Sequence, residues 1–474
     1  MSDAEGVSPR KKRIVSSLAL GFGAEIINKI SPLIVLSLAQ KRLGLGSLGS
    51  SLFALSIIEI TIPFIIFGYT YYGALRLPKI REDQAAQSEL VSDILFLRIF
   101  HAALSTFVLI GCTRFIASWH EHADVLLKLL PFLFIAAIDM TYVNIGSQRM
   151  GQLSVWVGAF KIVNLLLVYL FVHGPSDSDL FAIFMSISGA GVSICSAVWI
   201  WSRVKIRVPS WSKALKLMTQ VVGYAGIVFL YPLFERFDLL VIERYVSAES
   251  LGLYTGPWRL VMAIVPLFMV VASTYLAENV VHKSFEDLSK GAHQALFLSL
   301  ALTVPIAAAS PFVSGDILSF VFDESLRASQ GLFNVFTLSI LAEVFVVIWG
   351  MQVLLLQGQL RSLGFALGLG IVVGSLSAYL LQRGYGAMGG ALGALIGRWV
   401  TVFVIALRLL PLIRLLPIGD YLKVFFSAGI MALGLSVMPE GWPMVLRIIA
   451  GGLVYVLCIA AMNYSQLQTF LRRR

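Results

Sequence analysis

Apolar blocks recur along the whole chain and are separated by short polar segments. The blocks are about 20 residues long, which suits helices that cross a bilayer, whereas strands of a membrane barrel span about 10 residues and alternate polar with apolar positions. The pattern predicts fourteen membrane-spanning helices, at about 14–39, 48–73, 94–113, 125–146, 153–173, 180–201, 220–240, 253–279, 292–312, 329–356, 361–381, 386–407, 420–437 and 443–463.

The composition agrees with this pattern. Hydrophobic residues make up 58% of the chain and charged residues 13%, and the mean hydropathy is +0.86. A water-soluble fold does not hide so much apolar surface, so the sequence predicts an all-α integral membrane protein. The longest polar segments, 74–93 and 202–219, are too short for a separate soluble domain, so any function lies within or between the membrane helices.

Basic residues are distributed unevenly between the two sides of the predicted membrane. If the N-terminus is inside, 22 Lys and Arg residues lie on the inner side and 7 on the outer side. Because Lys and Arg concentrate in cytoplasmic loops, this bias predicts that both termini are cytoplasmic. The net charge of +10 then reflects topology and contact with anionic lipids, and not a nucleic-acid partner.

Several motifs that suggest other functions have a simpler explanation here. "GLGSLG" (44–49) has the spacing of a dinucleotide fingerprint, but it joins two predicted spans and is expected to be a turn. The three cysteines lie singly in apolar blocks, and His120 and His122 are expected to be solvated loop residues. The sequence contains no P-loop, HExxH or GxSxG motif. We therefore expect no metal, no cofactor and no enzymatic activity.

An internal repeat indicates two similar halves. "KRLGLGSLGSSLF" (41–53) and "ERYVSAESLGLYTG" (243–256) each place a basic residue, Ser-Leu-Gly and an aromatic residue after a span. Six spans per half predict two lobes of the same orientation around a cavity, arranged as a V. The expected division is 1–205 for the first lobe, 206–415 for the second, and 416–474 for a final helix pair with a basic cytoplasmic tail.

Basic residues inside the predicted spans are the main candidate chemistry. Six of them divide evenly between the lobes: Lys29, Arg98 and Lys161 in the first, and Arg236, Arg259 and Arg398 in the second. Such residues in a membrane usually face a functional pathway, and several cations suit a diphosphate. The distribution predicts a central cationic cavity, for which Lys161 and Arg398 are the strongest candidates because no acidic residue lies near them at helical spacing.

Structural roles remain open for the same residues. Glu25 lies four residues before Lys29 and is able to neutralise it, and Arg236 has acidic neighbours. Arg98 lies close enough to a span end to reach the headgroups. Glu59, Asp139 and Glu343 are acids inside spans that either couple an ion or pair with basic residues of other helices, and we favour pairing.

Four segments resemble a known family. They are "SLFALSIIEITIPFIIFGYTYYGALRLPKIREDQAAQSELVSDILFLRI" (51–99), "FDLLVIERYVSAESLGLYTGPWRLV" (237–261), "VFDESLRASQGLFNVFTLSI" (321–340) and "QGQLRSLGFALGLGIVVGSLSAYLLQRGYGAMGGALGALIGRWV" (357–400). In order, they resemble segments of bacterial polysaccharide repeat-unit flippases, which belong to the multidrug, oligosaccharidyl-lipid and polysaccharide exporter superfamily. "RGYG" (383–386) departs from the Pro-containing turn that is common in the family, and the acid-rich seventh span also departs from the usual pattern.

The resemblance implies a function as well as a fold. It implies fourteen helices, alternating access, and transfer of an undecaprenyl-diphosphate-linked oligosaccharide across the bacterial inner membrane. Its expected partners are the lipid-linked oligosaccharide, membrane lipids, and the polysaccharide polymerase and export machinery. Two alternatives stay open: a multidrug exporter of the same superfamily, whose usual cationic cargo the buried basic residues would repel, and a membrane-embedded polymerase or ligase, which would need a larger outer loop.

Overall fold

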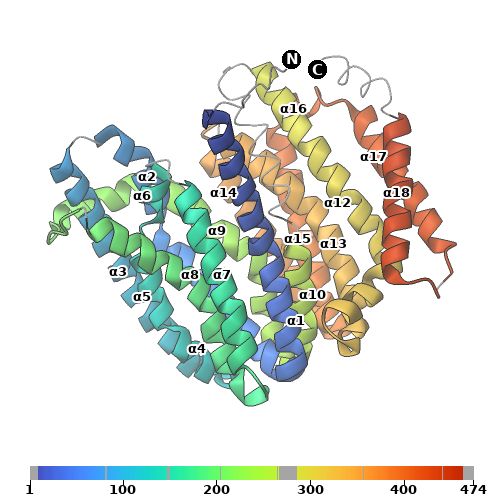
Figure 1. The fold of residues 1–474 in the computed structure, drawn as a ribbon, viewed down its shortest axis with the longest axis horizontal. Helices are drawn as coiled ribbons and strands as arrows, with labels where there is room; N and C mark the ends of the chain where they lie inside the picture. Colours follow the sequence, from blue (N-terminus) through green and yellow to red (C-terminus); the bar gives the residue numbers. More distant parts are fainter. Residues whose placement is uncertain are drawn as a thin grey trace, which may run out of the picture. The chain divides into compact units, whose positions relative to one another are not determined.

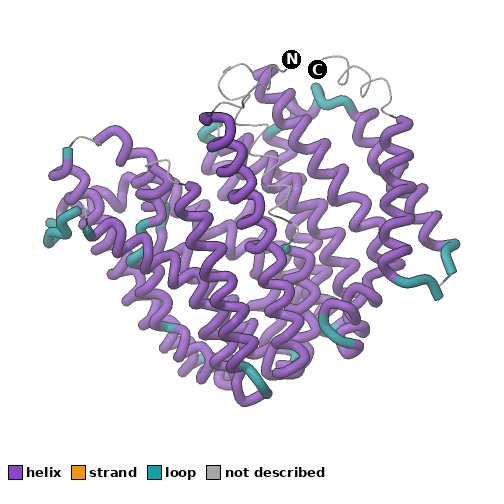
Figure 2. The backbone as a smooth tube through the Cα atoms, in the orientation of Figure 1, coloured by secondary structure: helices purple, strands orange, loops and turns teal. Residues whose placement is uncertain are grey.

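The computed structural model describes residues 9–80, 83–146, 150–202, 204–263, 265, 285–355, 357–439 and 441–462. Within these ranges, the side chains of residues 9–30, 33, 71, 74, 75, 78, 79, 145, 146, 150, 151, 154 and 285–287 lie outside the description. Helices make up nearly all of this part of the chain, and no strand occurs in it (Figure 2). The predicted all-α fold is therefore confirmed.

Contacts divide the chain into two compact units, Met1–Pro232 (unit 1) and Leu233–Arg474 (unit 2). The boundary falls inside one helix, α9 (Trp211–Ile242), next to its internal Pro232. A proline inside a helix removes one backbone hydrogen bond, so the helix is weakest at this point. The division into lobes at 205 and 415 stays a prediction.

Unit 1 contains the helices that correspond to the first six predicted spans and the beginning of the seventh (Figure 1). They are α1 (Pro9–Ile66), α2 (Tyr69–Arg76), η1 (Leu77–Ile80), α3 (Gln84–Phe115), η2 (Ala117–His122), α4 (Ala123–Leu129), α5 (Pro131–Ala137), α6 (Thr141–Gly146), α7 (Met150–Phe171), η3 (Pro175–Asp177), α8 (Ser178–Trp201) and the first part of α9. Two predicted spans join within α1 across a kink at Gly44, whose φ of 74° favours glycine.

The fourth predicted span, 125–146, is not one continuous helix. It is divided among α4, α5 and α6, with Asp139 in the gap between α5 and α6. The apolar pattern alone did not show this break, because hydropathy measures transfer into lipid and not the continuity of backbone hydrogen bonds. Helix interruptions inside membranes persist where protein groups satisfy the freed backbone, and the site below provides such groups.

Unit 2 contains the rest of α9 and the remaining elements. They are η4 (Glu243–Tyr245), α10 (Ala248–Met262), α12 (Phe285–Val321), η5 (Glu324–Ser329), α13 (Gln330–Phe345), the π-helical η6 (Val346–Leu354), α14 (Leu360–Tyr385), α15 (Ala387–Arg408), α16 (Leu410–Ile413), α17 (Ile418–Ser436) and α18 (Met444–Met462). Here α14 packs along α15, and α17 and α18 pack with each other and with α12. Part of the eighth predicted span, 253–279, lies outside the described residues.

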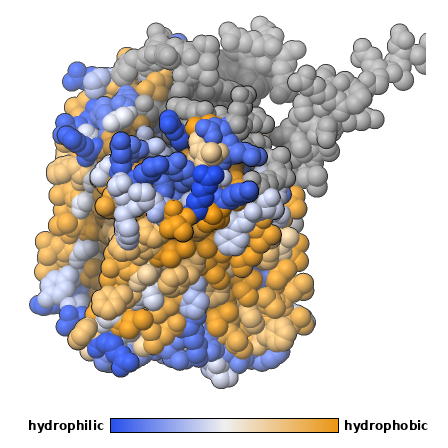
Figure 3. Space-filling view, turned by 90° about the vertical axis from the view of Figure 1, so that its left-hand side faces the viewer, coloured by the Kyte–Doolittle hydropathy of each residue, from blue (hydrophilic) through white to orange (hydrophobic). Residues whose placement is uncertain are grey.

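Ten helices in the described part of the chain are long and apolar enough to cross a membrane, and two shorter apolar helices lie at Pro131–Asn144 and Val155–Phe171. Large apolar side chains such as Phe107, Phe403 and Leu457 are exposed on these helices. Figure 3 shows a broad hydrophobic zone on one face, with hydrophilic residues toward its two ends. This is the surface that a multi-pass membrane protein presents to lipid.

Glycines allow the close approach of α14 and α15. A Cβ atom added at Gly393 would lie 2.3 Å from the backbone nitrogen of Ala378, and one at Gly397 would lie 2.5 Å from the carbonyl oxygen of Gly370. A larger residue at either position would push the helices apart. The small-residue spacing in "GYGAMGGALGALIG" (384–397) therefore serves tight helix packing.

Candidate functional site

Arg98 is the centre of a buried polar cluster in unit 1. Its side chain is fully buried on α3. One guanidinium nitrogen, Nη2, donates to Thr70 Oγ1 on α2 at 2.7 Å, and Nη1 donates to the main-chain carbonyl of Asp139. The guanidinium carbon lies 5.2 Å from the ring centroid of Tyr142 on α6. Arg98 therefore connects three elements within unit 1.

The gap between α5 and α6 explains how this cluster forms. A helix end leaves carbonyl groups without intrahelical partners, and the Asp139 carbonyl in this gap accepts from Arg98. The Asp139 carboxylate accepts from the Thr141 hydroxyl at 2.7 Å and from the Ser196 hydroxyl on α8 at 3.4 Å. The broken span thus supplies a carbonyl acceptor for Arg98 and a carboxylate that is fixed by two hydroxyl groups.

A second buried cluster lies in unit 2, around Arg398 on α15. Its Nε lies 3.8 Å from Glu343 Oε2 on α13, and the two side chains are 1% and 0% exposed. Its Nη2 donates to the Glu235 carbonyl on α9 at 3.0 Å. Glu343 and Arg398 thus form an ion pair between two helices. A buried pair of this kind sets which residues of the three helices face one another.

The remaining cations of unit 2 lie on α9 and α10. The guanidinium carbon of Arg236 lies 4.4 Å from the ring centroid of Trp258, which is a favourable cation–π geometry. The neighbouring acid Asp238 is buried and accepts a hydrogen bond from Tyr254. Arg259, on α10, is half-buried. These contacts tie α9 to α10 and leave part of the Arg236 and Arg259 side chains accessible.

The other predicted site residues lie on α1 and α7. Lys161 is half-buried on α7, and its carbonyl oxygen accepts from the Ser31 hydroxyl at 3.2 Å. Glu59 is half-buried on α1. The side chains of Glu25 and Lys29 lie outside the described residues. The structure thus brings Arg98 to Asp139 and Arg398 to Glu343, and a cavity shared by the two lobes stays a prediction.

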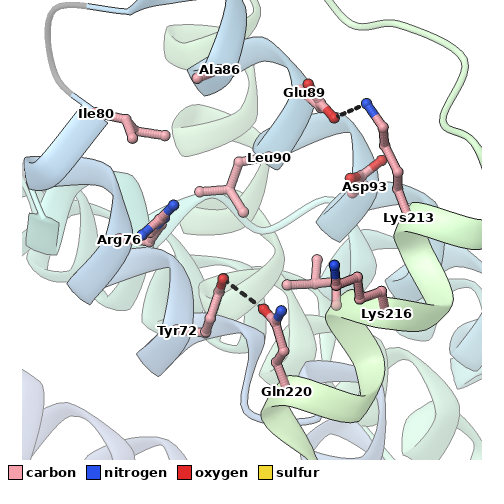
Figure 4. Close-up of a pocket in the computed structure, with 11 residues that line it drawn as sticks. Tyr72, Arg76, Ile80, Ala86, Glu89, Leu90, Asp93, Lys213, Lys216 and Gln220 are labelled. Atoms are coloured by element: carbon pink, nitrogen blue, oxygen red, sulfur yellow. Dashed lines mark hydrogen bonds and ion pairs between the residues drawn. The ribbon is translucent and has the colours of Figure 1, made fainter.

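Sequence reasoning missed a pocket in unit 1. It has a volume of about 280 Å³ and is lined by Tyr72, Arg76, Ile80, Ala86, Glu89, Leu90, Asp93, Lys213, Lys216, Leu217 and Gln220, from α2, η1, α3 and α9 (Figure 4). In the sequence, its basic residues contributed only to the count of Lys and Arg on the inner side of the predicted membrane. Because its two halves are more than a hundred residues apart in the sequence, no local motif announced it.

His122 lies outside the predicted membrane spans and has a shifted pKa. His122 is 2% exposed, so burial lowers its pKa, and its Nδ1 lies 3.0 Å from the Ser50 hydroxyl. The expectation of a solvated loop residue was therefore wrong for His122, although His120 is exposed. Lys128 forms ion pairs with Asp124 at 2.8 Å and with Asp179 at 2.7 Å. Both residues hold together helix ends of unit 1.

Comparison with known proteins identifies the fold. No protein-family model matches the chain. The chain is 26% identical over 263 residues to the teichuronic acid biosynthesis protein TuaB of Bacillus subtilis. The matched region covers 50% of this chain and 52% of TuaB. The chain thus spans about half the length of the curated relative that it matches.

Solved structures match much more of the chain. The lipid II flippase MurJ in an inward closed conformation matches with a TM-score of 0.75 and 15% identity, over 96% of this chain and all of MurJ. The eukaryotic multidrug and toxin extrusion (MATE) transporter AtDTX14 matches with a TM-score of 0.54 and 16% identity, over 88% of this chain and 99% of AtDTX14. The chain therefore shares the fold of MurJ and of MATE transporters. The fold that the family resemblance implied is thus confirmed.

Proposed function

We propose that the protein is a flippase for a lipid-linked oligosaccharide. It moves an undecaprenyl-diphosphate-linked repeat unit from the cytoplasmic to the outer leaflet of the bacterial inner membrane by alternating access, and thereby serves surface polysaccharide biosynthesis. The observation that carries the proposal is the match to MurJ, with a TM-score of 0.75 over all of that flippase, against 0.54 for AtDTX14. The match to TuaB supports a role in making a cell-surface polymer.

The physical task is to carry a charged, hydroxyl-rich headgroup through hydrocarbon. Polar groups that lose water without new partners cost several kcal/mol each. Among the six predicted cations, Arg98 and Arg398 are fully buried and held by neighbouring groups, so their role is to position helices. Lys161, Arg236 and Arg259 retain accessible surface, and we assign them, with Lys29, to contact with the diphosphate. Basic side chains match this anion, and arginine does so with paired hydrogen bonds.

A multidrug exporter is the second candidate, because the fold also matches MATE transporters. The two functions predict different cargo charges. Accessible cations within the membrane helices attract a diphosphate and repel a cationic drug. A polymerase or ligase is disfavoured, since the solved structures with this fold are a flippase and transporters.

The experiment is to delete the gene and to locate the lipid-linked glycan with a membrane-impermeant glycosidase on intact spheroplasts. A flippase predicts that complete repeat units accumulate in a protected, cytoplasmic-facing form and become accessible when the wild-type gene is restored. Lys161→Gln and Lys161→Glu should restore less, while Lys205→Glu, a charge reversal at an exposed loop residue, should restore fully. Single repeat units on the outer face would instead indicate a polymerase or ligase, and an unchanged glycan pool would favour a drug exporter.

A further inference from the structure

Part of the lining of the pocket between α2, α3 and α9 consists of apolar residues that are packed in the core of unit 1. Leu217 is 6% exposed, and it belongs with Leu77 to a buried cluster against which Ile80 and Leu90 pack. Two bridges cross the pocket to α9. Lys213 Nζ lies 2.5 Å from Glu89 Oε1 of α3, and Tyr72 of α2 donates to Gln220 Oε1 at 2.9 Å. Figure 4 shows these bridges at two different sides of the pocket. The pocket is therefore built by tertiary packing and is already formed without a ligand.

The charges around the pocket are not balanced. Lys213 neutralises Glu89. The charged side chains that remain in the lining are those of Arg76, Lys216 and Asp93. Neither Arg76 nor Lys216 forms an ion pair or a side-chain hydrogen bond with any residue in the described part of the chain. Both are exposed, whereas Asp93 is 7% exposed. The pocket thus offers two available cations and one recessed carboxylate.

This combination selects a ligand with both an anionic part and hydroxyl groups. Arg and Lys are the residues that proteins use for phosphate oxygens. The Asp93 carboxylate would repel a purely anionic ligand, but it accepts hydrogen bonds from hydroxyl groups, and the Gln220 amide both donates and accepts. The volume of about 280 Å³ is just below the range of drug-sized ligand sites, which begins at about 300 Å³. It suits one phosphorylated sugar and not a whole oligosaccharide.

We propose that this pocket binds a sugar phosphate, with Arg76 and Lys216 on the phosphate and with Asp93 and Gln220 on sugar hydroxyl groups. The charge bias predicts that this end of unit 1 faces the cytoplasm. Because the proposal rests on the proposed function, the ligand in the cell is the first sugar and adjoining phosphate of the lipid-linked headgroup, held before it enters the transport path. A soluble sugar phosphate has the same chemistry and would occupy the same groups.

The test is calorimetric binding to the full-length protein in phosphatidylcholine nanodiscs, with glucose 1-phosphate, inorganic phosphate and glucose as probes. Glucose 1-phosphate should bind more tightly than either of the other two. Arg76→Ala and Lys216→Ala should each weaken it by about tenfold, the value expected for losing one charged hydrogen bond. Asp93→Asn should bind inorganic phosphate better, because a like charge is removed, and should lose the preference for the sugar phosphate.

The matched control is Lys205→Ala, which removes the same charge from an exposed position in the connector that precedes α9. Binding should be unchanged in this variant. Equal weakening in Lys205→Ala, or no weakening in Arg76→Ala and Lys216→Ala, would show that charge attracts the probe without a site and would overturn the proposal. Because Arg76 and Lys216 are exposed, their loss is not expected to unfold the protein.

Two further arms separate the sources of the ligand. In nanodiscs that contain phosphatidylglycerol, the lipid headgroup can compete with glucose 1-phosphate. If this lipid abolishes glucose 1-phosphate binding and Lys216→Ala removes the competition, the pocket binds a phospholipid headgroup and the sugar assignment fails. In cells, Lys216→Ala should accumulate protected repeat units if the pocket receives the lipid-linked headgroup. Full export by a variant that no longer binds glucose 1-phosphate would assign the pocket to a soluble sugar phosphate. Calorimetry reports occupancy and not translocation, so its result holds even if the deletion strain shows no flippase defect.

Discussion

The buried pair of Arg398 and Glu343 allows a quantitative test of unit 2. Arg398→Met removes the positive charge and leaves Glu343 in a site that water does not reach. At the observed separation of 3.8 Å, and with an effective dielectric constant of about 20, two opposite charges attract each other by about 4 kcal/mol. Measured losses when one member of a buried pair is removed are about 3–5 kcal/mol. We therefore expect Arg398→Met to lower the free energy of unfolding by about 3–5 kcal/mol.

The double variant, Arg398→Met with Glu343→Leu, is the informative comparison. It replaces both charges with apolar groups, and such replacements of buried pairs are often neutral or stabilising. It should therefore be much more stable than Arg398→Met alone, although the hydrogen bond from Arg398 to the Glu235 carbonyl is lost at about 1–2 kcal/mol. Glu343→Leu alone should also destabilise, because it leaves the buried Arg398 without its carboxylate partner.

The assay is reversible unfolding in mixed SDS micelles, followed by helical circular dichroism, for the wild type, both single variants and the double variant. A coupling energy of about 2 kcal/mol or more would agree with the geometry. Strictly additive losses would refute the reasoning, because they would show that the two charges do not stabilise each other. Flipping by the double variant tests the positioning role of Arg398: retained activity agrees with it, and lost activity in a variant as stable as the wild type would assign Arg398 to the diphosphate instead.

Three other results follow from packing and burial. Gly393→Leu should destabilise the α14–α15 contact by about 1–3 kcal/mol, because its Cβ would meet the Ala378 backbone. The control Gly384→Ala, where an added Cβ has nothing within 4 Å, should be neutral or slightly stabilising. Thermal unfolding of the two variants checks this. Burial lowers the pKa of His122 below its ordinary value of 6.5, so the unfolded chain binds the proton more readily than the folded chain. The free energy of unfolding should therefore be complete above about pH 6.5 and decline as the pH falls. A His122→Gln variant should show a flatter profile of stability against pH, and an unchanged profile would contradict the assignment. Tyr254→Phe should cost about 1–3 kcal/mol, because a buried carboxylate of α9 loses its hydrogen-bond donor, and SDS unfolding against a Tyr245→Phe control, at an exposed tyrosine, measures it.

The sequence alone determined the class of this protein. Block length and hydropathy are local properties, and each of the fourteen predicted spans overlaps a helix in the described part of the chain. The glycine spacing at 384–397 is also a local property, since small residues four apart share one helix face and allow close packing. The resemblance in four segments correctly indicated the fold that the structural comparisons confirm.

Only the tertiary structure decided which charges meet. Glu343 and Arg398 are 55 residues apart in the numbering, and the register of α13 against α15 sets their distance, which no periodicity along one helix reveals. The break at Asp139 depends on partners from α3 and α8 that satisfy the interrupted backbone and carboxylate. Likewise, Arg76 and Lys216 line one pocket only because α9 returns to pack on α2 and α3. Hydropathy determines which segments enter the membrane, whereas the pairing of polar groups between helices depends on contacts that are distant in the sequence.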